Sequence, residues 1–215
     1  MPCGIMDQFI AVMGKRGHAL LIDCMTLKAD PVPMNNPEVC VLVTNSNVKH
    51  KLTGTEYPER RSMCAKAAEI LGKQSLRQAT LADLSDKFDV METQSTMYSR
   101  AHHVITEIER TQKAAEMLKK NDYVAFGQLM QQSHDSLRDD FEVSCKELDQ
   151  LVELATECQG VFGSRMTGGG FGGCTVTLCK KESVEIVKLH ISKHYNGTAS
   201  FYVCEPVDGS FHFRL

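Results

Sequence analysis

The sequence predicts an α+β protein whose sheet is antiparallel. After a first strand, several helical segments follow one another, and two later strands are joined only by a glycine-rich loop. This order is typical of an antiparallel sheet with segregated helices, since a parallel sheet needs a crossover between its strands. The chain has 215 residues, of which 42% are hydrophobic and 24% charged, so it can bury a sizeable core.

The N-terminal part of the chain predicts two elements and a linker. Apolar residues recur at helical spacing over residues 4–13, and residues 18–24 form a short apolar run that is typical of a buried strand. Residues 30–37 contain three prolines and two asparagines, which predicts an interdomain linker. We therefore expect two units, with residues 1–36 as the tail of one domain and residues 37–215 as a second domain.

The remaining elements are predicted from the periodicity of apolar residues and from turn-forming residues. Strands are expected in apolar, β-branched runs, at residues 39–44, 161–166, 174–179, 198–204 and 211–215. Helices are expected where apolar residues recur every three or four positions, at residues 56–71, 80–87, 99–120, 123–138, 144–158 and 183–195. Ser144 and Glu147 have the spacing of a capping box, which predicts that a helix begins there.

Charge and cysteine usage exclude several classes of protein. The net charge is −3, so no basic surplus indicates a nucleic-acid or anionic-membrane partner. The N-terminal residues lack a signal-peptide pattern, and no apolar run approaches the roughly 20 residues of a membrane span. The nine cysteines are scattered without a C-x-x-C pair, which predicts reduced and mostly buried thiols. We expect a cytoplasmic protein without a membrane partner.

The strongest local signal is the run Thr167-Gly168-Gly169-Gly170-Phe171-Gly172-Gly173. Successive backbone N–H groups of such a run can bind an anion, and a tight connection between two strands is the alternative. The run contains G-x-G-x-x-G, but an alternating β-branched segment follows it where a dinucleotide-binding loop needs a helix. No Gly-Lys-Ser/Thr follows either, so this is not a P-loop.

Asp7 is the second signal, because it lies among apolar residues near the start of a predicted helix. Such an aspartate can serve the helix dipole, or it can orient or deprotonate a hydroxyl nucleophile. His102 and His103 are adjacent, so on a helix they point about 100° apart and cannot bind one ion in the usual manner. We expect no metal site formed by the protein alone.

Four segments in order resemble one family of sugar kinases. Residues 2–9 (PCGIMDQF) resemble the catalytic-aspartate motif of galactokinases, and residues 163–174 (GSRMTGGGFGGC) resemble the third motif of their superfamily, the GHMP kinases. Residues 56–61 (EYPERR) and 136–145 (SLRDDFEVSC) resemble galactokinase segments between them. The glycine motif specifies only the superfamily, whereas residues 6–9 together with 56–61 favour galactokinases.

The resemblance implies a fold, an activity and roles for particular residues. It implies a ferredoxin-like C-terminal domain, preceded by the tail of an N-terminal domain that contains a left-handed βαβ unit. The activity implied is ATP- and Mg²⁺-dependent phosphorylation of galactose at its anomeric hydroxyl. Asp7 would accept or orient the hydroxyl proton, Gly4 and Tyr57 would contact the sugar, and the glycine loop would support the cleft between sugar and phosphates. The resemblance also implies a monomer for the complete protein.

Two family motifs are not present in these residues. The first motif supplies an arginine and sugar-binding residues, and the second wraps the phosphates of ATP; in the family both precede the aspartate motif. We therefore expect this chain to be a fragment, an incomplete gene model or a truncated isoform, and to be inactive alone. The alternatives are a non-catalytic, sugar-sensing module of the same fold and an N-acetylgalactosamine kinase.

Overall fold

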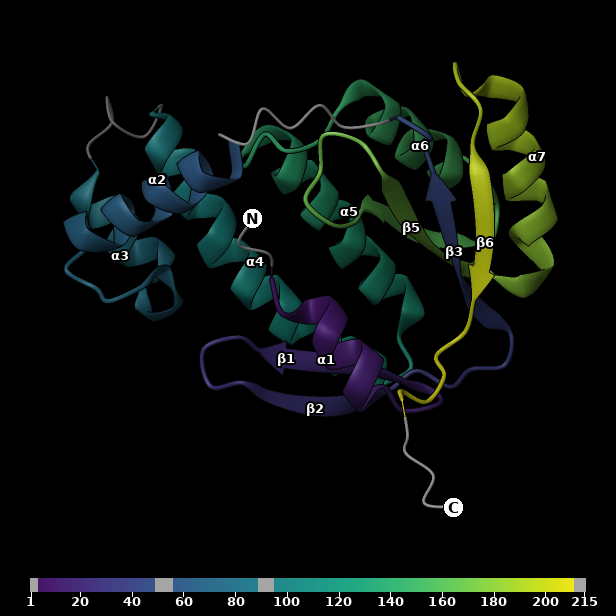
Figure 1. Ribbon diagram of the computed structural model, residues 1–215, viewed down its shortest axis with the longest axis horizontal. Helices are drawn as coiled ribbons and strands as arrows, with labels where there is room; N and C mark the ends of the chain where they lie inside the picture. The colour runs from purple at the N-terminus through teal and green to yellow at the C-terminus, as the bar shows by residue number, and fades with distance from the viewer. Residues whose placement is uncertain (1–3, 49–55, 89–94, 211–215) are drawn as a thin grey trace.

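A four-stranded antiparallel sheet lies at the centre of the fold (Figure 1). The computed structural model describes residues 4–48, 56–88 and 95–210. In spatial order the strands are β4 (Val161–Met166), β5 (Cys174–Lys180), β3 (Val39–Asn45) and β6 (Ser200–Cys204). Each neighbouring pair is antiparallel, which confirms the predicted α+β class and its antiparallel sheet.

Alternation along β3 divides the core between the two faces of the sheet. Cys40 and Leu42 point toward one face and pack with α6 (Lys146–Thr156) and α7 (Val184–His194). Val39, one position away from Cys40, belongs to the cluster on the opposite face. Because side chains alternate along a strand, one apolar run thus supplies two separate clusters.

Helices from the middle of the chain pack against one another, and the last of them contacts the sheet. They are α2 (Glu56–Ile70), the short 3-10 helix η1 (Leu76–Gln78), α3 (Leu81–Lys87), α4 (Thr96–Lys119) and α5 (Tyr123–Asp139). The first four of these share one apolar cluster, in which Leu84 and Ala101 are fully buried. Thr80 and Asp83 form a capping box at the start of α3, so this short helix has a defined N-terminus.

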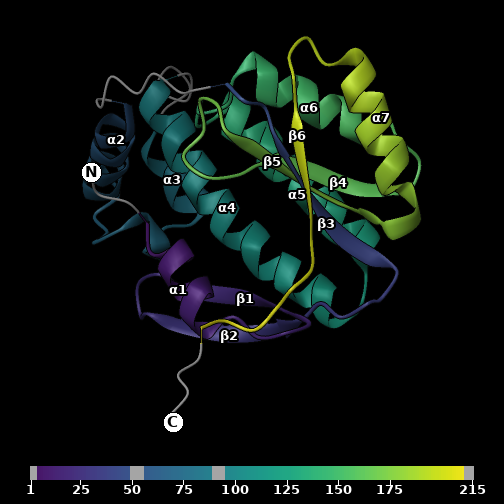
Figure 2. The same ribbon diagram turned by 45° about the vertical axis from the view of Figure 1, so that its right-hand side comes forward.

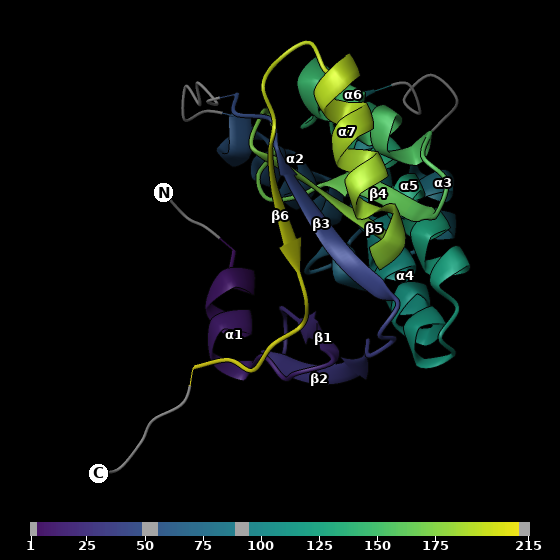
Figure 3. The same cartoon turned by 90° about the vertical axis from the view of Figure 1, so that its right-hand side faces the viewer.

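The N-terminal helix α1 (Met6–Met13) lies against a hairpin of β1 (His18–Asp23) and β2 (Lys28–Pro33) (Figure 2). The predicted linker was therefore wrong for residues 30–33, which form most of β2. Proline is tolerated there because a two-stranded hairpin leaves every second N–H unpaired. Val32 is only 2% exposed and shares the apolar cluster of α4 and β5. Figure 3 shows α1 and the hairpin at the opposite end of the molecule from α7.

Other details differ from the sequence-based expectations. The helix expected from Ser144 begins at Lys146, and the Ser144 hydroxyl donates to the Asp149 carboxylate over 2.5 Å, so the predicted capping box was wrong. Eight described cysteines are free thiols, but only Cys40 and Cys179 are buried. The strand expected at residues 211–215 lies outside the described residues. Among the described helices, none is long and apolar enough to cross a bilayer.

Candidate functional site

A cavity of about 800 Å³ opens between α1, the hairpin, α4, α5 and the sheet. Its walls are largely apolar, with contributions from Leu20, Phe126 and Met130. Five predicted site residues line it: Gly4 and Asp7 near the N-terminus, and Thr167, Gly168 and Gly169 of the glycine loop. A mostly apolar cavity with a few convergent polar groups is typical of a small-molecule site. The structure thus brings together the aspartate and glycine-loop motifs, which are about 160 positions apart in the sequence.

Asp7 lies in the first turn of α1, where the helix dipole stabilises a carboxylate. Its side chain is exposed, and it makes no hydrogen bond or ion pair with any other residue that the structure describes. Because α1 buries none of its residues, the carboxylate stands on the cavity wall rather than in the core. A free carboxylate in this position can accept a hydrogen bond from a ligand hydroxyl.

The glycine loop has two parts with different surroundings. At Gly168 and Gly169, a Cβ atom would meet nothing within 4 Å, since these residues border the open cavity. At Gly170, a Cβ atom would lie 2.0 Å from the carbonyl oxygen of Val143, and φ is +82°. Gly170 is therefore required by close backbone packing, whereas Gly168 and Gly169 leave room for a ligand.

The second half of the loop is tied to its surroundings by backbone hydrogen bonds. The N–H of Phe171 donates to the Val143 carbonyl over 2.7 Å, although φ of Phe171 is +60°. Both the N–H and the hydroxyl of Ser46 donate to the carbonyl of Gly173 over 2.8 Å. Of the two interpretations left open by the sequence, a tight connection describes residues 170–173, and a ligand cradle fits residues 168 and 169.

The segment that holds Phe171 is itself clamped by two arginines. Arg60 of α2 donates to the carbonyl oxygens of Phe141 and Glu142 over 2.8 and 3.2 Å. Arg100 of α4, which is 1% exposed, donates to the Asp140 carbonyl and over 2.5 Å to the Glu142 carboxylate. These contacts connect the segments at residues 56–61 and 136–145, which sequence reasoning singled out without a structural reason.

A charged group on the cavity wall was missed by sequence reasoning. The Glu107 carboxylate accepts from the Ser133 hydroxyl over 2.5 Å and from Arg165 over 3.3 Å, and it pairs with Arg110. All four residues line the cavity. Burial lowers the pKa of Arg165, and the nearby Glu107 carboxylate counteracts this effect. In the sequence, Glu107 and Arg110 can be seen only as a pair at helical spacing. Their partners Ser133 and Arg165 come from α5 and β4, and the sequence does not show that these residues meet.

The remaining predicted residues lie away from this cavity or outside the description. Tyr57 is in the first turn of α2, but its side chain lies outside the described part of the chain. Gly172 and Gly173 have positive φ and do not line the cavity. His102 and His103 bind different partners, Asp140 and Ser136. Within residues 4–48, 56–88 and 95–210, no group of three or more His, Cys, Asp or Glu side chains is arranged to hold a metal ion.

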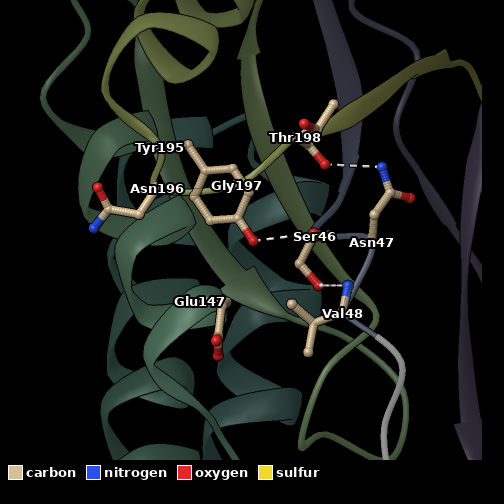
Figure 4. Close-up of a pocket in the computed structure, with 8 residues that line it drawn as sticks. All are labelled: Ser46, Asn47, Val48, Glu147, Tyr195, Asn196, Gly197 and Thr198. Carbon is tan, nitrogen blue, oxygen red and sulfur yellow. Dashed lines mark hydrogen bonds between the residues drawn. The ribbon is translucent and has the colours of Figure 1, made fainter.

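A second cavity of about 340 Å³ is lined by Ser46, Tyr195 and neighbouring residues (Figure 4). Its polar groups bind one another: the Tyr195 hydroxyl donates to the Ser46 carbonyl over 3.0 Å, and the Asn47 amide donates to the Thr198 carbonyl over 2.9 Å. Glu147 is the one carboxylate among its lining residues. Since it contains neither Asp7 nor the open glycines, the larger cavity is the better candidate.

Comparison with known sequences gives one consistent result. Residues 114–197 match the family model described as GHMP kinases C terminal. The galactokinases of Bos taurus and Homo sapiens are each 55% identical over 210 residues, which cover 98% of this chain and 53% of the relative. A galactokinase of Haemophilus influenzae is 42% identical over 217 residues. The chain spans about half the length of the curated relatives that it matches.

Solved structures agree with this result. The structure of Lactococcus lactis galactokinase complexed with galactose has a TM-score of 0.91 and 33% identity, over 98% of this chain and 56% of that one. Mevalonate kinase of L. major in complex with R-mevalonate has a TM-score of 0.51 at 19% identity, a likeness of fold alone. Over 98% of its length, this chain therefore shares the fold of the matching part of that galactokinase structure.

Proposed function

Because this chain matches the C-terminal half of galactokinases over 98% of its length, we propose that it supplies the catalytic carboxylate and one wall of a galactokinase active site. The complete protein would transfer the γ-phosphoryl group of ATP to the anomeric hydroxyl of galactose. One observation carries the proposal: Asp7 and the open glycines Gly168 and Gly169 line the same cavity.

The proposed chemistry assigns one role to each side of the cavity. The anomeric oxygen attacks the γ-phosphorus, the new O–P bond forms as the bond to the β-phosphate oxygen breaks, and ADP leaves. Asp7 accepts or orients the hydroxyl proton, which makes the oxygen a better nucleophile. Gly4 adjoins Asp7 on the sugar side, and Tyr57 on α2 would complete the sugar contacts. Gly168 and Gly169 leave space for the reacting groups at the opposite wall.

ATP and Mg²⁺ belong to this proposal as the nucleotide and its counter-ion. Bound Mg²⁺ neutralises charge that develops on the transferred phosphoryl group. Mg²⁺ is usually held by one or two carboxylates together with substrate phosphates, so a cluster of several protein ligands is not required. The room beside Gly168 and Gly169, which a Cβ atom would fill, fits the approach of an anionic group to backbone.

The proposal is tested with a chimera in which the N-terminal half of the human relative precedes residues 1–215. ATP-dependent phosphorylation of galactose is expected from the chimera, and a variant with Asp7→Asn is its internal control. N-acetylgalactosamine is offered as a second substrate, because it separates a galactokinase from an N-acetylgalactosamine kinase. Galactose binding without turnover, by a chimera that also binds ATP, would instead favour a sugar-sensing module.

A further inference from the structure

Helix α5 packs directly on the free edge of the sheet. A Cβ atom on Gly127 of α5 would lie 2.0 Å from the carbonyl oxygen of Phe162, and one on Gly163 would lie 2.1 Å from the carbonyl oxygen of Gly127. The backbones of α5 and β4 therefore touch, and only glycine is small enough at the two positions. Since β4 is an edge strand, its outward N–H groups have no neighbouring strand to pair with.

Met166, the last residue of β4, has one of these outward-pointing backbone N–H groups. The next residue, Thr167, donates its N–H to Cys174 of β5 over 3.0 Å, so the N–H of Met166 points away from β5. Met166 is 1% exposed, and an unpaired N–H there would be costly. His134 of α5 meets this need, because its Nδ1 accepts the Met166 N–H over 3.3 Å.

This hydrogen bond fixes the tautomer of His134. Nδ1 accepts, so in the neutral ring the proton is on Nε2. Nε2 lies 3.3 Å from the Asp149 carboxylate of α6, which in turn accepts from the Ser144 hydroxyl. The imidazole is 1% exposed, and its Nε2 has no hydrogen-bond partner among the described residues. Its hydrogen bond to the Met166 N–H therefore connects α5 with β4 at the point where the glycine loop begins.

Ser133, which precedes His134 on α5, is linked through Glu107 to Arg165, which precedes Met166 on β4. Ser133 donates to Glu107, which accepts from Arg165, so consecutive residues of α5 support consecutive residues of β4. Thr167, Gly168 and Gly169 follow directly and line the cavity. The position of these three residues is thus determined at their N-terminal side by the contacts of Arg165 and Met166.

We propose that His134 is a positioning residue, which holds the start of the glycine loop in its reactive place through the N–H of Met166. This inference rests on the proposed galactose phosphorylation, but the hydrogen bond between His134 and the Met166 N–H can be tested without it. His134 touches neither the cavity nor a substrate, so it acts through Met166 and Thr167. Its loss is expected to lower kcat more than it raises KM for galactose, because phosphoryl transfer depends on positioning.

Protonation of His134 breaks the same contact. Both ring nitrogens are donors in imidazolium, so Nδ1 would then face the Met166 N–H donor. Burial lowers the pKa of His134 from its usual value, and Asp149 counteracts this. The other charged groups that act on the ring are Arg138 and Asp135 of α5 and Arg165 of β4. The neutral, anchoring form is therefore favoured at neutral pH.

Two substitutions separate the two ring nitrogens. His134→Asn places an amide oxygen close to the position of Nδ1, and so retains an acceptor for Met166. His134→Gln places its amide near the position of Nε2, toward Asp149, and leaves the Met166 N–H without an acceptor. Amide hydrogen exchange of both variants is measured in the 215-residue chain, and galactose kinetics are measured in the chimera described above. Circular dichroism establishes that each variant is folded.

The expected result is that exchange of the Met166 amide accelerates at least about tenfold in His134→Gln but less than threefold in His134→Asn, with kcat following the same order. In the unaltered chain, the protection factor of this amide is expected to fall on acidification, at a pH below the usual pKa of histidine. Equal exchange and equal kcat in both variants, or a pH-independent protection factor, would overturn the proposal. An inactive parent chimera would instead contradict the proposed function. The exchange data would still decide whether the hydrogen bond from the Met166 N–H to His134 positions the loop.

Discussion

The N–H of Phe171 and the carbonyl of Val143 are joined by a 2.7 Å hydrogen bond, and this contact divides the glycine loop into a fixed half and an open half. Val143 belongs to a segment that Arg60 and Arg100 hold from two helices. The fixed half therefore depends on the helical layer, while the open half faces the cavity.

The two halves are expected to respond differently to a methyl group. Gly170→Ala should destabilise the fold by about 1–3 kcal/mol or more, since φ is +82° and the new Cβ would overlap the Val143 carbonyl. Gly169→Ala is the matched control, because its Cβ would enter open space. Chemical denaturation of both variants measures the difference. Equal stability would show that residue 170 belongs to an adaptable connection.

Gly169→Ala has a second expected effect, because its methyl group occupies the cavity. In the chimera, this variant should retain its stability and lose activity or galactose affinity. Normal kinetics would show that no ligand approaches the loop at this residue.

Asp7 is expected to be required for turnover but not for folding. In the chimera, Asp7→Asn should lower kcat at least about a hundredfold, the lower end for lost general-base help. The melting temperature should remain nearly unchanged, because the carboxylate is exposed and α1 buries none of its residues. Asp30→Asn, at an exposed position on β2, is the control. Turnover within a few-fold of the parent chimera would remove Asp7 from the catalytic role.

The stability of the chain should fall on mild acidification. Burial lowers the pKa of His103 to about 4, although Glu107 and Asp140 counteract this, and the unfolded chain has the usual value near 6.5. The unfolded state thus binds more protons between these values, so the stability contribution is complete above pH 6.5 and is lost as the pH falls toward 4. The loss is at most roughly 3 kcal/mol for this histidine.

Urea denaturation at several pH values from 8 to 4 measures this loss. His103→Gln cannot titrate, so its free energy of unfolding should change less over that range than the parent's, whatever its stability at pH 8. His134, whose pKa is also lowered, contributes in the same direction and leaves a residual slope. An identical pH dependence of parent and variant would contradict the prediction.

Local patterns predicted most elements within a few residues, for example the helix expected at 123–138 and observed at Tyr123–Asp139. They failed where a partner from elsewhere in the chain decides the outcome. Pro31 and Pro33 predicted a linker. They lie instead in β2, which tolerates proline because it pairs with β1 on one side only. Ser144 has the spacing of a capping residue, yet Asp149 binds its hydroxyl.

The candidate site shows the same division between local and tertiary information. Asp7 and the glycine run could be found by motif, because each is contiguous. The group of Glu107, Ser133 and Arg165 could not, since its members are on three different elements and meet only through tertiary packing. His134 was missed for the same reason: its role depends on the orientation of one N–H group in an edge strand.

The boundary expected between residues 36 and 37 gives the last prediction. The hairpin packs on α4 and β5 through Val32, which is 2% exposed, so residues 18–33 should resist limited proteolysis together with the rest of the chain. Val32→Ala removes two buried methyl groups and should cost about 1–3 kcal/mol, with faster cleavage in the hairpin. Asp30→Ala changes an exposed neighbour on β2 and should leave the cleavage pattern unchanged.

The sites of cleavage, read by mass spectrometry, distinguish the two possibilities. Early cuts ahead of His18 are expected, because α1 has no buried residue although its C-terminal end accepts backbone hydrogen bonds from Gly209 and Ser210. Rapid cleavage at residues 34–37 with release of an intact hairpin would instead mean that residues 1–36 form a separate unit. In that case the packing of Val32 would contribute little to stability, and Val32→Ala would melt at the same temperature as the parent.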